Sequence, residues 1–392
     1  MYQDYSSSST RSYFRLAVFL FFTLVALAVA ARHAMVVLSG RHYWTLGDWQ
    51  INYGAGFVRR GITGSATFLV SDVTGLSLNL AAGAMQILLY FSVAALTLYL
   101  FSKVRWSGPV LMLLFSPVFL LMPFYYMHMS MSKELIGFLG LGLMASAVSG
   151  RNWLLWIGIA TFAVAGFAHE VNAFLAPAAL GFPLLFLIDG TISRRQALLA
   201  CAAILAVALA ALVSATLFQG QGMSQAICDQ IVAHGGSVKQ CKAGGPIGWL
   251  ERDTAFGFAV MWKMTIDPGN WKWFILAYLL AMAPFLLFRL ARPYSTRTNL
   301  WLLVAVFIGI LTMAPLFVVA TDWGRWIAMY VFGLTLLTIT ALRLKLIEER
   351  IDSLGPLFLI YGLFWSMPEA GYTHTTWGML EYFRRGMEFL GN

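Results

Sequence analysis

Long apolar runs alternate with short polar connections along almost the whole chain. A helix that crosses a bilayer needs about 20 apolar residues, and runs of about that length recur throughout the sequence. They predict about eleven spans, near residues 14–38, 80–101, 108–122, 135–148, 153–167, 173–188, 197–218, 273–288, 300–320, 327–342 and 354–367. The alternating pattern of a membrane barrel strand is absent, so we expect residues 1–392 to form a single all-α, polytopic transmembrane helical bundle.

The connections between these runs predict an orientation. Every second connection contains Lys or Arg, and basic residues favour the cytoplasmic side. With those connections inside, the N-terminus is cytoplasmic, and an odd number of spans places the C-terminus outside. No small-residue cleavage site follows the first apolar run, because Arg32 and His33 come next, so we expect it to be retained as a span.

Two of the connections expected outside are long. Residues 39–79 are rich in glycine and aromatic residues, and we expect short amphipathic helices there. Residues 219–272 contain Cys228 and Cys241. An extracytoplasmic location makes a disulfide between them reasonable, and two free thiols are the alternative. Cys201 lies in an apolar helix and is expected to pack there.

Composition agrees with a membrane protein. Hydrophobic residues make up 60% of the chain and charged residues 11%, against about 25% charged in soluble domains. Mean hydropathy is +0.75. The net charge of +9 is scattered over loops, without a basic helix or an aromatic-basic module. It therefore indicates membrane topology and membrane lipid as a partner, and no nucleic acid.

The segment from residue 47 to residue 64 is the strongest candidate for chemistry. It combines Asp48 with the adjacent Arg59 and Arg60 and with several glycines, which permit close approach of a ligand. Paired arginines suit bidentate binding of phosphate. Trp44, Trp49 and Tyr53 suit sugar faces. The alternative is an interfacial loop anchored by its aromatic residues.

Three further outer connections contain compact charged motifs. Lys133 and Glu134 open a predicted helix, where a lysine can bind an anion, although helix capping by this segment is an alternative. His169 and Glu170 lie between two spans, as do Asp322 and Arg325, which are spaced to pair on a helix. The residues show no metal-ligand spacing, so we expect no metal.

Residues 369–385, after the last span, have the pattern of an amphipathic helix on the outer membrane surface. Glu369, His374, Arg384 and Arg385 belong to it. We expect this segment to bind the membrane surface rather than to take part in chemistry.

The outer motifs together resemble those of known membrane enzymes. A carboxylate in the first outer loop resembles the arrangement of polyprenyl-phosphate-dependent GT-C glycosyltransferases. The segment from Asp48 to Gly64, Ser132-Lys133-Glu134, His169-Glu170 and Asp322-x-x-Arg325 also resemble Wzy-type polymerases of exopolysaccharide and O-antigen clusters. The chain departs from many GT-C enzymes in lacking their paired acidic signature and a large soluble outer domain.

The resemblance implies a function at the outer face of a bacterial inner membrane. A sugar would pass from a polyprenyl-(pyro)phosphate donor to a glycan acceptor, with other polysaccharide-assembly proteins as possible partners and without a cofactor. Asp48 would be the general base, and His169, oriented by Glu170, is the alternative base. The expected phosphate ligands are Arg59, Arg60, Lys133 and Arg325, with Glu134 and Asp322 as orienting residues. Trp44, Trp49 and Tyr53 would stack on sugar rings.

Two other functions fit the same residues. A transporter or flippase of lipid-linked sugars or anions would bind phosphate through the same cations without breaking a bond. An integral-membrane acyltransferase would use His169 as its base. The one-sided distribution of acidic residues and histidine favours an enzyme over a transporter, and acyl transfer does not call for four cationic groups.

Overall fold

The computed structural model describes residues 6–40, 43–125, 131–148, 150–241, 245–291 and 312–368. The described chain is mostly helical. Among the described residues, five helices are long and apolar enough to cross a membrane: Ser12–Ser39, Leu78–Ser102, Glu170–Asp189, Arg194–Leu217 and Trp323–Arg343. Most of the expected span 300–320 lies outside the described residues. A pair bent by 83°, Thr254–Ile266 and Trp271–Leu287, would make a sixth. The expected helical fold with several apolar, membrane-length helices is therefore confirmed, whereas the count of eleven spans is not.

The first half of the chain begins with the long helix α1. Its elements are α1 (Ser6–Ser39), α2 (Tyr43–Gln50), α3 (Gly61–Thr74), α4 (Leu78–Ser102), α5 (Gly108–Leu114), α6 (Met122–Tyr125), α7 (Glu134–Ala145), α8 (Trp153–Ala168), η2 (Glu170–Leu175) and α9 (Ala176–Asp189). Several helix ends follow from local sequence. Ser107 caps α5, with Pro109 in its first turn, and Gly190 ends α9 in the left-handed conformation.

The second half begins with α10, whose start is fixed by a capping box between Ser193 and Gln196. Its elements are α10 (Arg194–Leu217), α11 (Ser224–Ala233), η3 (Val238–Cys241), η4 (Gly248–Glu251), α12 (Thr254–Met261), η5 (Trp262–Ile266), α13 (Trp271–Met282), η6 (Ala283–Leu287), β1 (Phe288–Leu290), α15 (Trp323–Arg343), β2 (Ile347–Glu349) and α16 (Leu357–Leu363). Residues 312–319 are also helical.

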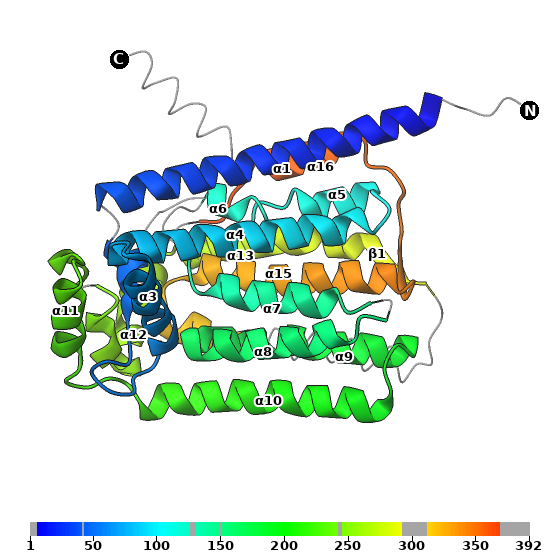
Figure 1. Ribbon diagram of the computed structural model, residues 1–392. Helices are drawn as coiled ribbons and strands as arrows, with labels where there is room; N and C mark the ends of the chain where they lie inside the picture. Colours follow the sequence, from blue (N-terminus) through cyan, green and yellow to red (C-terminus); the bar gives the residue numbers. More distant parts are fainter. Residues whose placement is uncertain are drawn as a thin grey trace, which may run out of the picture.

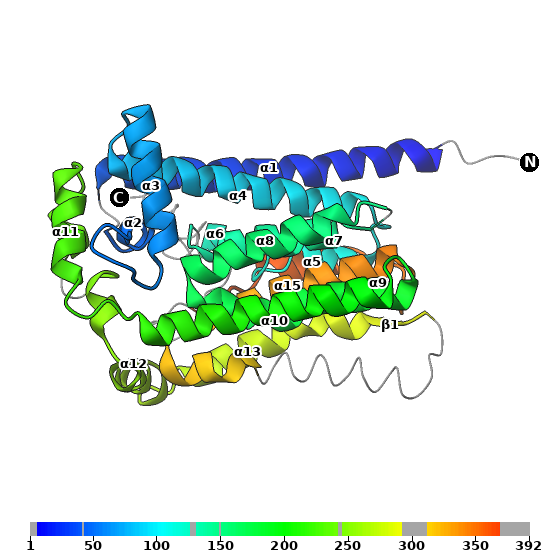
Figure 2. The same ribbon diagram turned by 60° about the horizontal axis from the view of Figure 1, so that its bottom comes forward.

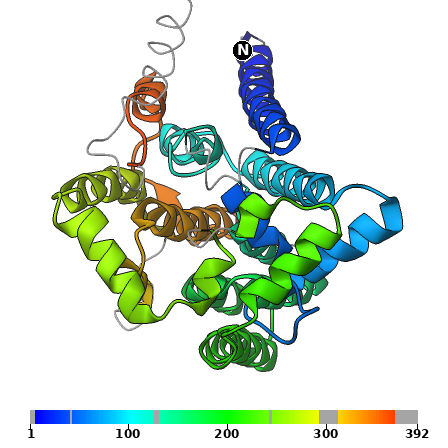
Figure 3. The ribbon, with the colours of Figure 1, turned by 90° about the vertical axis from the view of Figure 1, so that its left-hand side faces the viewer.

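Helices α1 and α10 lie at opposite edges of the bundle (Figures 1 and 3). Both expose large apolar side chains, among them Leu24 and Leu38 on α1 and Leu198 and Leu209 on α10. Water would not stabilise such surfaces, whereas lipid would. The outer faces of both helices are therefore suited to contact the bilayer.

The shorter apolar helices α7 and α8 lie between these edges and pack closely on each other. A Cβ atom added at Gly158 would lie 2.6 Å from Met144 Cγ and 2.8 Å from the Gly140 carbonyl oxygen. Small residues at such a contact let two helix backbones approach. This contact lies toward the end of α7 and the start of α8, and it holds together two helices whose other ends carry two of the charged motifs.

The two ends of the bundle differ in chemistry. Helices α2, α3, α11 and α12 gather at one end, on the left in Figures 1 and 2. At the other end β1 and β2 form a short antiparallel ribbon, which the all-α prediction did not include. Connections predicted to be cytoplasmic meet there: Arg105 pairs with Asp352, Arg289 with Glu348, and Arg343 donates to the Ala145 carbonyl.

The two long connections are folded rather than extended. Residues 39–79 contain α2 and α3, and residues 219–272 contain α11, α12 and three short turns of helix. A buried cluster joins them, in which Ile51 and Val58 of the first segment pack with Ile227, Ile231 and Leu250 of the second. Residues 39–79 and 219–272 together cover one end of the bundle, and we call these two segments the cap.

Candidate functional site

The four charged motifs meet at the end of the bundle that bears the cap. Asp48 comes from α2, Arg59 and Arg60 precede α3, and the other pairs stand at the start of α7, between α8 and η2, and at the start of α15. Ion pairs join them in two sets, one of Asp48, Arg59, Arg60, Lys133 and Glu170 and the other of Glu134, Asp322 and Arg325. His169 lies between the two sets, 3.9 Å from Glu170 and 3.5 Å from Arg325. We call these nine residues the charge cluster: Asp48, Arg59, Arg60, Lys133, Glu134, His169, Glu170, Asp322 and Arg325.

Asp48 lies between two cations. Its Oδ1 is 3.5 Å from Lys133 Nζ and 3.9 Å from Arg60 Nη1. Its side chain is 15% exposed, while that of Lys133 is fully buried. Asp48 Oδ1 is itself buried, so the carboxylate is only partly exposed beside a cation that is enclosed. Such a carboxylate can meet an incoming hydroxyl while the lysine stays in place.

Arg60 connects two of the motifs through side chain and backbone. Its Nε donates to both carboxylate oxygens of Glu170, at 2.9 and 3.1 Å, and its Nη2 donates to Oε1. Its backbone has φ 68°, a left-handed conformation that is uncommon for a residue with a side chain. Lys133 Nζ donates to the Arg60 carbonyl at 3.1 Å. The side chain of Lys133 and the left-handed turn at Arg60 therefore hold each other in position.

Arg59 belongs to the edge of the cluster. Its Nη2 donates to the carbonyl oxygens of Trp249 and Leu250, at 3.1 and 3.2 Å, and its Nη1 lies 3.7 Å from Glu170 Oε1. Arg59 thus joins the cap to the cluster. Two backbone carbonyls already occupy part of its guanidinium, so it is less available to a phosphate than the sequence suggests.

The segment before α7 is fixed by buried polar groups. Trp49 Nε1 and Gln86 Nε2 both donate to the Met131 carbonyl, at 3.0 and 3.1 Å. Gln86 Oε1 contacts His33 Nε2 at 2.8 Å, so α1, α2 and α4 all support this carbonyl. Lys133 follows two residues later. Burial lowers the pKa of Lys133 to about 8, against the opposing attraction of Asp48.

His169 acts as a helix cap in this structure. Its Nδ1 accepts the backbone N–H of Val171 at 3.2 Å. Burial lowers the pKa of His169 well below its usual value, and nearby Arg60 lowers it further. The other ring nitrogen, Nε2, faces the guanidinium Nη2 of Arg325 at 3.5 Å, and a guanidinium only donates. Because both ring nitrogens already face donors, His169 is poorly placed to take a proton from a substrate, which disfavours it both as the alternative base and as the base of an acyltransferase.

Glu170 does not orient His169 as the sequence analysis expected. It accepts three hydrogen bonds from Arg60, whereas His169 Nδ1 is 3.9 Å from its Oε2. The physical reason is that adjacent side chains diverge, while the arginine reaches across from another connection with a planar pair of donors. Glu170 therefore positions Arg60.

Arg325 stands between two carboxylates. Its Nη2 is 3.1 Å from Glu134 Oε1, and its Nη1 is 3.5 Å from Asp322 Oδ2. Its guanidinium also lies over the Trp326 ring, 4.5 Å from the centroid. Burial raises the pKa of Asp322, and the charge of Arg325 partly offsets this effect. The expected pairing of Asp322 with Arg325 is present, and Glu134 completes it.

The charge of the described cluster is balanced. The cations Arg59, Arg60, Lys133 and Arg325 face the carboxylates Asp48, Glu134, Glu170 and Asp322. From the sequence, all four cations were expected to bind a phosphate. A phosphate must instead compete with carboxylates that already neutralise these cations, which makes protonation of a carboxylate a means of releasing them.

The aromatic residues expected to stack on sugars fall into two groups. Trp49 is 2% exposed and its indole donates to Met131, so it cannot offer a face to a sugar. Trp44 is partly exposed and meets Trp249 edge-on at 5.9 Å. Tyr53 is partly exposed and stacks on Phe57 at 5.0 Å. The stacking role is therefore wrong for Trp49 and stays a prediction for the other two.

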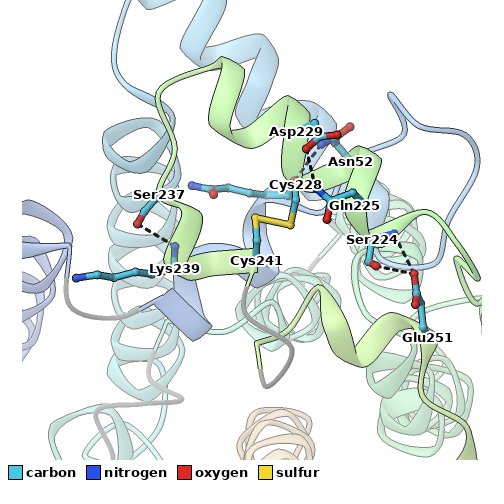
Figure 4. Close-up of a disulfide and its surroundings, with 10 residues drawn as sticks. Asn52, Ser224, Gln225, Cys228, Asp229, Ser237, Lys239, Cys241 and Glu251 are labelled. Atoms are coloured by element: carbon cyan, nitrogen blue, oxygen red, sulfur yellow. Dashed lines mark hydrogen bonds between the residues drawn. A yellow bond between two sulfur atoms is a disulfide. The ribbon is translucent and has the colours of Figure 1, made fainter.

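A disulfide between Cys228 and Cys241 joins α11 to η3 within the second segment of the cap (Figure 4). Beside it, the buried Gln240 donates to Asn79 Oδ1 at 2.7 Å, and Gln50 donates to the same oxygen at 2.8 Å. A Cβ atom at Gly47 would lie 3.1 Å from Pro246. The disulfide-bonded loop thus packs on α2, the helix that contains Asp48.

Sequence reasoning missed several supporting residues. Gln86 and Asn172 are completely buried in apolar surroundings. The Asn172 amide donates to the Ala165 carbonyl at 3.0 Å, next to the end of α8. An isolated amide side chain within an apolar run was the available signal, because a buried amide needs partners. Asn79 and Gln240 lie in polar connections and offered no such signal.

Within the described residues, no three of His, Cys, Asp and Glu are placed to share a metal ion. The carboxylates of the cluster face cations rather than one another. The expected C-terminal amphipathic helix, residues 369–385, lies outside the described residues.

No protein-family model, curated protein or solved structure matches the chain. The likeness to GT-C and Wzy-type enzymes therefore stays a prediction from short motifs, and function has to be inferred from the charge cluster.

Proposed function

We propose that the chain is a membrane glycosyltransferase or polysaccharide polymerase. It would transfer a sugar from a polyprenyl-(pyro)phosphate donor to a glycan acceptor at the extracytoplasmic face of a bacterial inner membrane. The convergence of four separate connections into one partly exposed cluster of carboxylates and cations carries this proposal. Such a cluster at the end of an apolar bundle suits a substrate with a charged head and a lipid tail.

The orientation follows from the two ends of the bundle. The end opposite the cluster gathers Arg105, Arg289 and Arg343, and short basic connections favour the cytoplasm. The N-terminus would then be cytoplasmic and the cluster extracytoplasmic. The shorter apolar helices α7 and α8 run beside the long spans (Figure 1), and adding these two to the six candidates would give eight spans among the described residues.

Asp48 would act as the general base. As the acceptor hydroxyl attacks the anomeric carbon of the donor, its proton passes to the Asp48 carboxylate. The bond from that carbon to the phosphate oxygen breaks, and the bonding electron pair leaves with the phosphate. Asp48 suits this role because its carboxylate is partly exposed and faces two cations, whereas Glu134 is buried and Glu170 is held by Arg60. Asp322 is more exposed but faces Arg325.

Proton transfer to Asp48 would also change the charge of the cluster. A protonated Asp48 no longer neutralises Lys133 and Arg60, its neighbours at 3.5 and 3.9 Å. The balanced cluster thereby gains one net positive charge in the step in which negative charge develops on the leaving phosphate. Preorganised cations of this kind stabilise a transition state more than a ground state.

The test is turnover of a labelled polyprenyl-linked donor by purified protein in detergent. Asp48→Asn should lower kcat by about 10²–10⁴-fold, which is the usual contribution of a general base. Asp72→Asn is the matched control, because Asp72 lies on α3 in the cap and its side chain is 62% exposed. Normal turnover by the Asp48 variant would remove Asp48 as the base.

A transporter or flippase of lipid-linked sugars is the second candidate. The balanced charge of the cluster favours this candidate in one respect. A lipid-linked phosphate could displace the carboxylates from Arg60 and Arg325 and leave again without any covalent bond being broken. Detergent micelles offer no gradient and no second compartment. Release of free polyprenyl phosphate there would support the enzyme, and vesicle uptake without such release would support the transporter.

A further inference from the structure

A polar pocket of about 370 Å³ lies in the cap, outside the charge cluster. It is bordered by the start of α11, by η4 and by the Cys228–Cys241 disulfide. Its polar side chains come from Gln221, Ser224, Gln225, Glu251 and Arg252. The volume is within the range of roughly 300–1,000 Å³ typical of small-molecule sites, but the lining is polar where such sites are usually apolar.

The lining groups include both donors and acceptors (Figure 4). Glu251 Oε1 accepts from the amide and the hydroxyl of Ser224, at 3.1 and 2.6 Å, and these bonds lower the pKa of Glu251. The amide of Gln225 donates to Asp229 Oδ1 at 2.8 Å and that of Gln221 to the Glu251 carbonyl at 3.0 Å, which leaves one N–H and the oxygen of each amide for a ligand, and Arg252 adds a cation. One carboxylate and one guanidinium cancel in charge. The pocket therefore suits a neutral ligand with many hydroxyl groups better than an anion.

The wall of the pocket is connected to the charge cluster. Gly248, Glu251 and Arg252 line the pocket, and between them Trp249 and Leu250 offer their carbonyl oxygens to Arg59. Trp249 also meets Trp44 edge-on, so the same turn of helix adjoins the aromatic residues that precede Asp48. A glycan chain bound in the pocket would therefore contact η4, the turn of helix whose carbonyl groups bind Arg59 of the charge cluster.

We propose that this pocket binds the glycan acceptor. The inference rests on the proposed glycosyl transfer and adds the place where the acceptor is recognised. Sugar hydroxyls would bond to Glu251, Gln225 and Arg252, and the acceptor end would extend past Trp249 toward Asp48. Recognition of the acceptor is thereby separated from the cations expected to bind the donor phosphate.

The pocket can be filled without touching the cluster. Gln225 is exposed on α11, so Gln225→Trp should block the pocket while the helix remains intact. Lys239→Trp is the matched control, because Lys239 is exposed in the neighbouring η3 and does not line the pocket. The probe is a set of end-labelled oligosaccharides released from the cell's own surface polysaccharide, titrated with full-length protein in micelles and followed by fluorescence anisotropy.

We expect the Gln225 variant to bind the oligosaccharides at least about tenfold more weakly, and the Lys239 variant to bind like the native chain. Equal binding by both variants, or no binding by the native chain, would overturn the pocket assignment. Donor hydrolysis without acceptor is measured separately. If the native protein binds the oligosaccharides through Gln225 but does not turn over the donor, the proposed function is refuted. The assignment of the pocket as a glycan site would then still hold.

Discussion

Lys133 is the most enclosed cation of the charge cluster, and its surroundings limit the pH range in which it can attract an anion. Its side chain is fully buried, and burial lowers its pKa to about 8. Only the protonated amine attracts a phosphate. The cluster should therefore bind its donor best below pH 8.

Donor binding is expected to weaken as pH rises through about 8. In the limit, KM for the donor should rise by roughly tenfold per pH unit, because one proton is required. Steady-state turnover from pH 7 to pH 10 measures this. Lys133→Met should raise KM at pH 7 and remove the inflection. A profile that stays flat to the alkaline end would exclude Lys133 as a donor ligand.

The same lysine has the opposite effect on stability. Its pKa is about 8 in the folded protein and 10.5 in the unfolded chain. Between these values the unfolded chain binds the proton that the folded protein has lost, so the contribution of Lys133 to the free energy of unfolding rises with pH. Loss of donor binding above pH 8 should thus occur without loss of the Lys133 contribution to folding.

Sequence reasoning identified all nine residues of the charge cluster but not their pairing. Each motif was found within its own connection, and neighbours in sequence were the obvious partners. Pairing neighbours in sequence gave the right partners for Asp322 and Arg325, which share a helical turn. It failed for Glu170, because its partner Arg60 comes from a distant connection. Pairing across connections depends on tertiary packing, which no local spacing reveals.

At the scale of elements, the apolar runs of the sequence predicted the positions of helices well. They did not predict where a run is broken into two shorter helices. Residues 108–122 were expected to form one span, but α5 ends at Leu114 and α6 begins only at Met122. Pro117 follows α5 in this run, and proline cannot supply the backbone N–H that a helix interior needs. Residues 153–167 were expected as a span and form α8 within one residue at each end.

The contact between α7 and α8 is expected to be sensitive to a single methyl group. Gly158→Ala should lower the stability by about 1–3 kcal/mol, because the added Cβ would press on the Gly140 carbonyl and on Met144. Thermal unfolding in detergent measures the change. The same variant should lower turnover, since Lys133 and His169 stand at the cluster ends of these helices.

Ala160→Leu provides the control for this helix. Ala160 lies on α8 and is exposed, so a larger apolar side chain there should contact lipid or detergent and change little. Equal unfolding temperatures for native protein and the Gly158 variant would show that α7 and α8 are not in close contact at this position.

At the scale of the whole molecule, the disulfide of the cap supports the charge cluster indirectly, through hydrogen bonds to α2. The disulfide closes a separation of 13 residues, and Gln240 beside it shares Asn79 with Gln50 of α2. Opening the disulfide should therefore loosen the support of Asp48 and of Arg59, although neither residue touches a cysteine.

Reduction with dithiothreitol, or the pair Cys228→Ser and Cys241→Ser, should destabilise the cap by about 2–4 kcal/mol and reduce turnover several-fold. Cys201→Ser should leave both unchanged, because Cys201 is a free thiol in α10. Thermal unfolding and donor turnover report the two effects. Labelling of all three thiols in unreduced protein would contradict the disulfide.

The pairing of Glu134 with Arg325 also has a consequence for biosynthesis. Asp48, Arg60, Lys133 and Glu170 are all present once η2 has been synthesised, whereas Arg325 arrives only with α15. Until then the nascent chain holds Glu134 at the start of α7 without this cation, and an unpaired carboxylate is costly to bury. Insertion of α15 thus neutralises Glu134, and a chain truncated before Trp323 would expose an acidic defect that quality-control proteases can recognise.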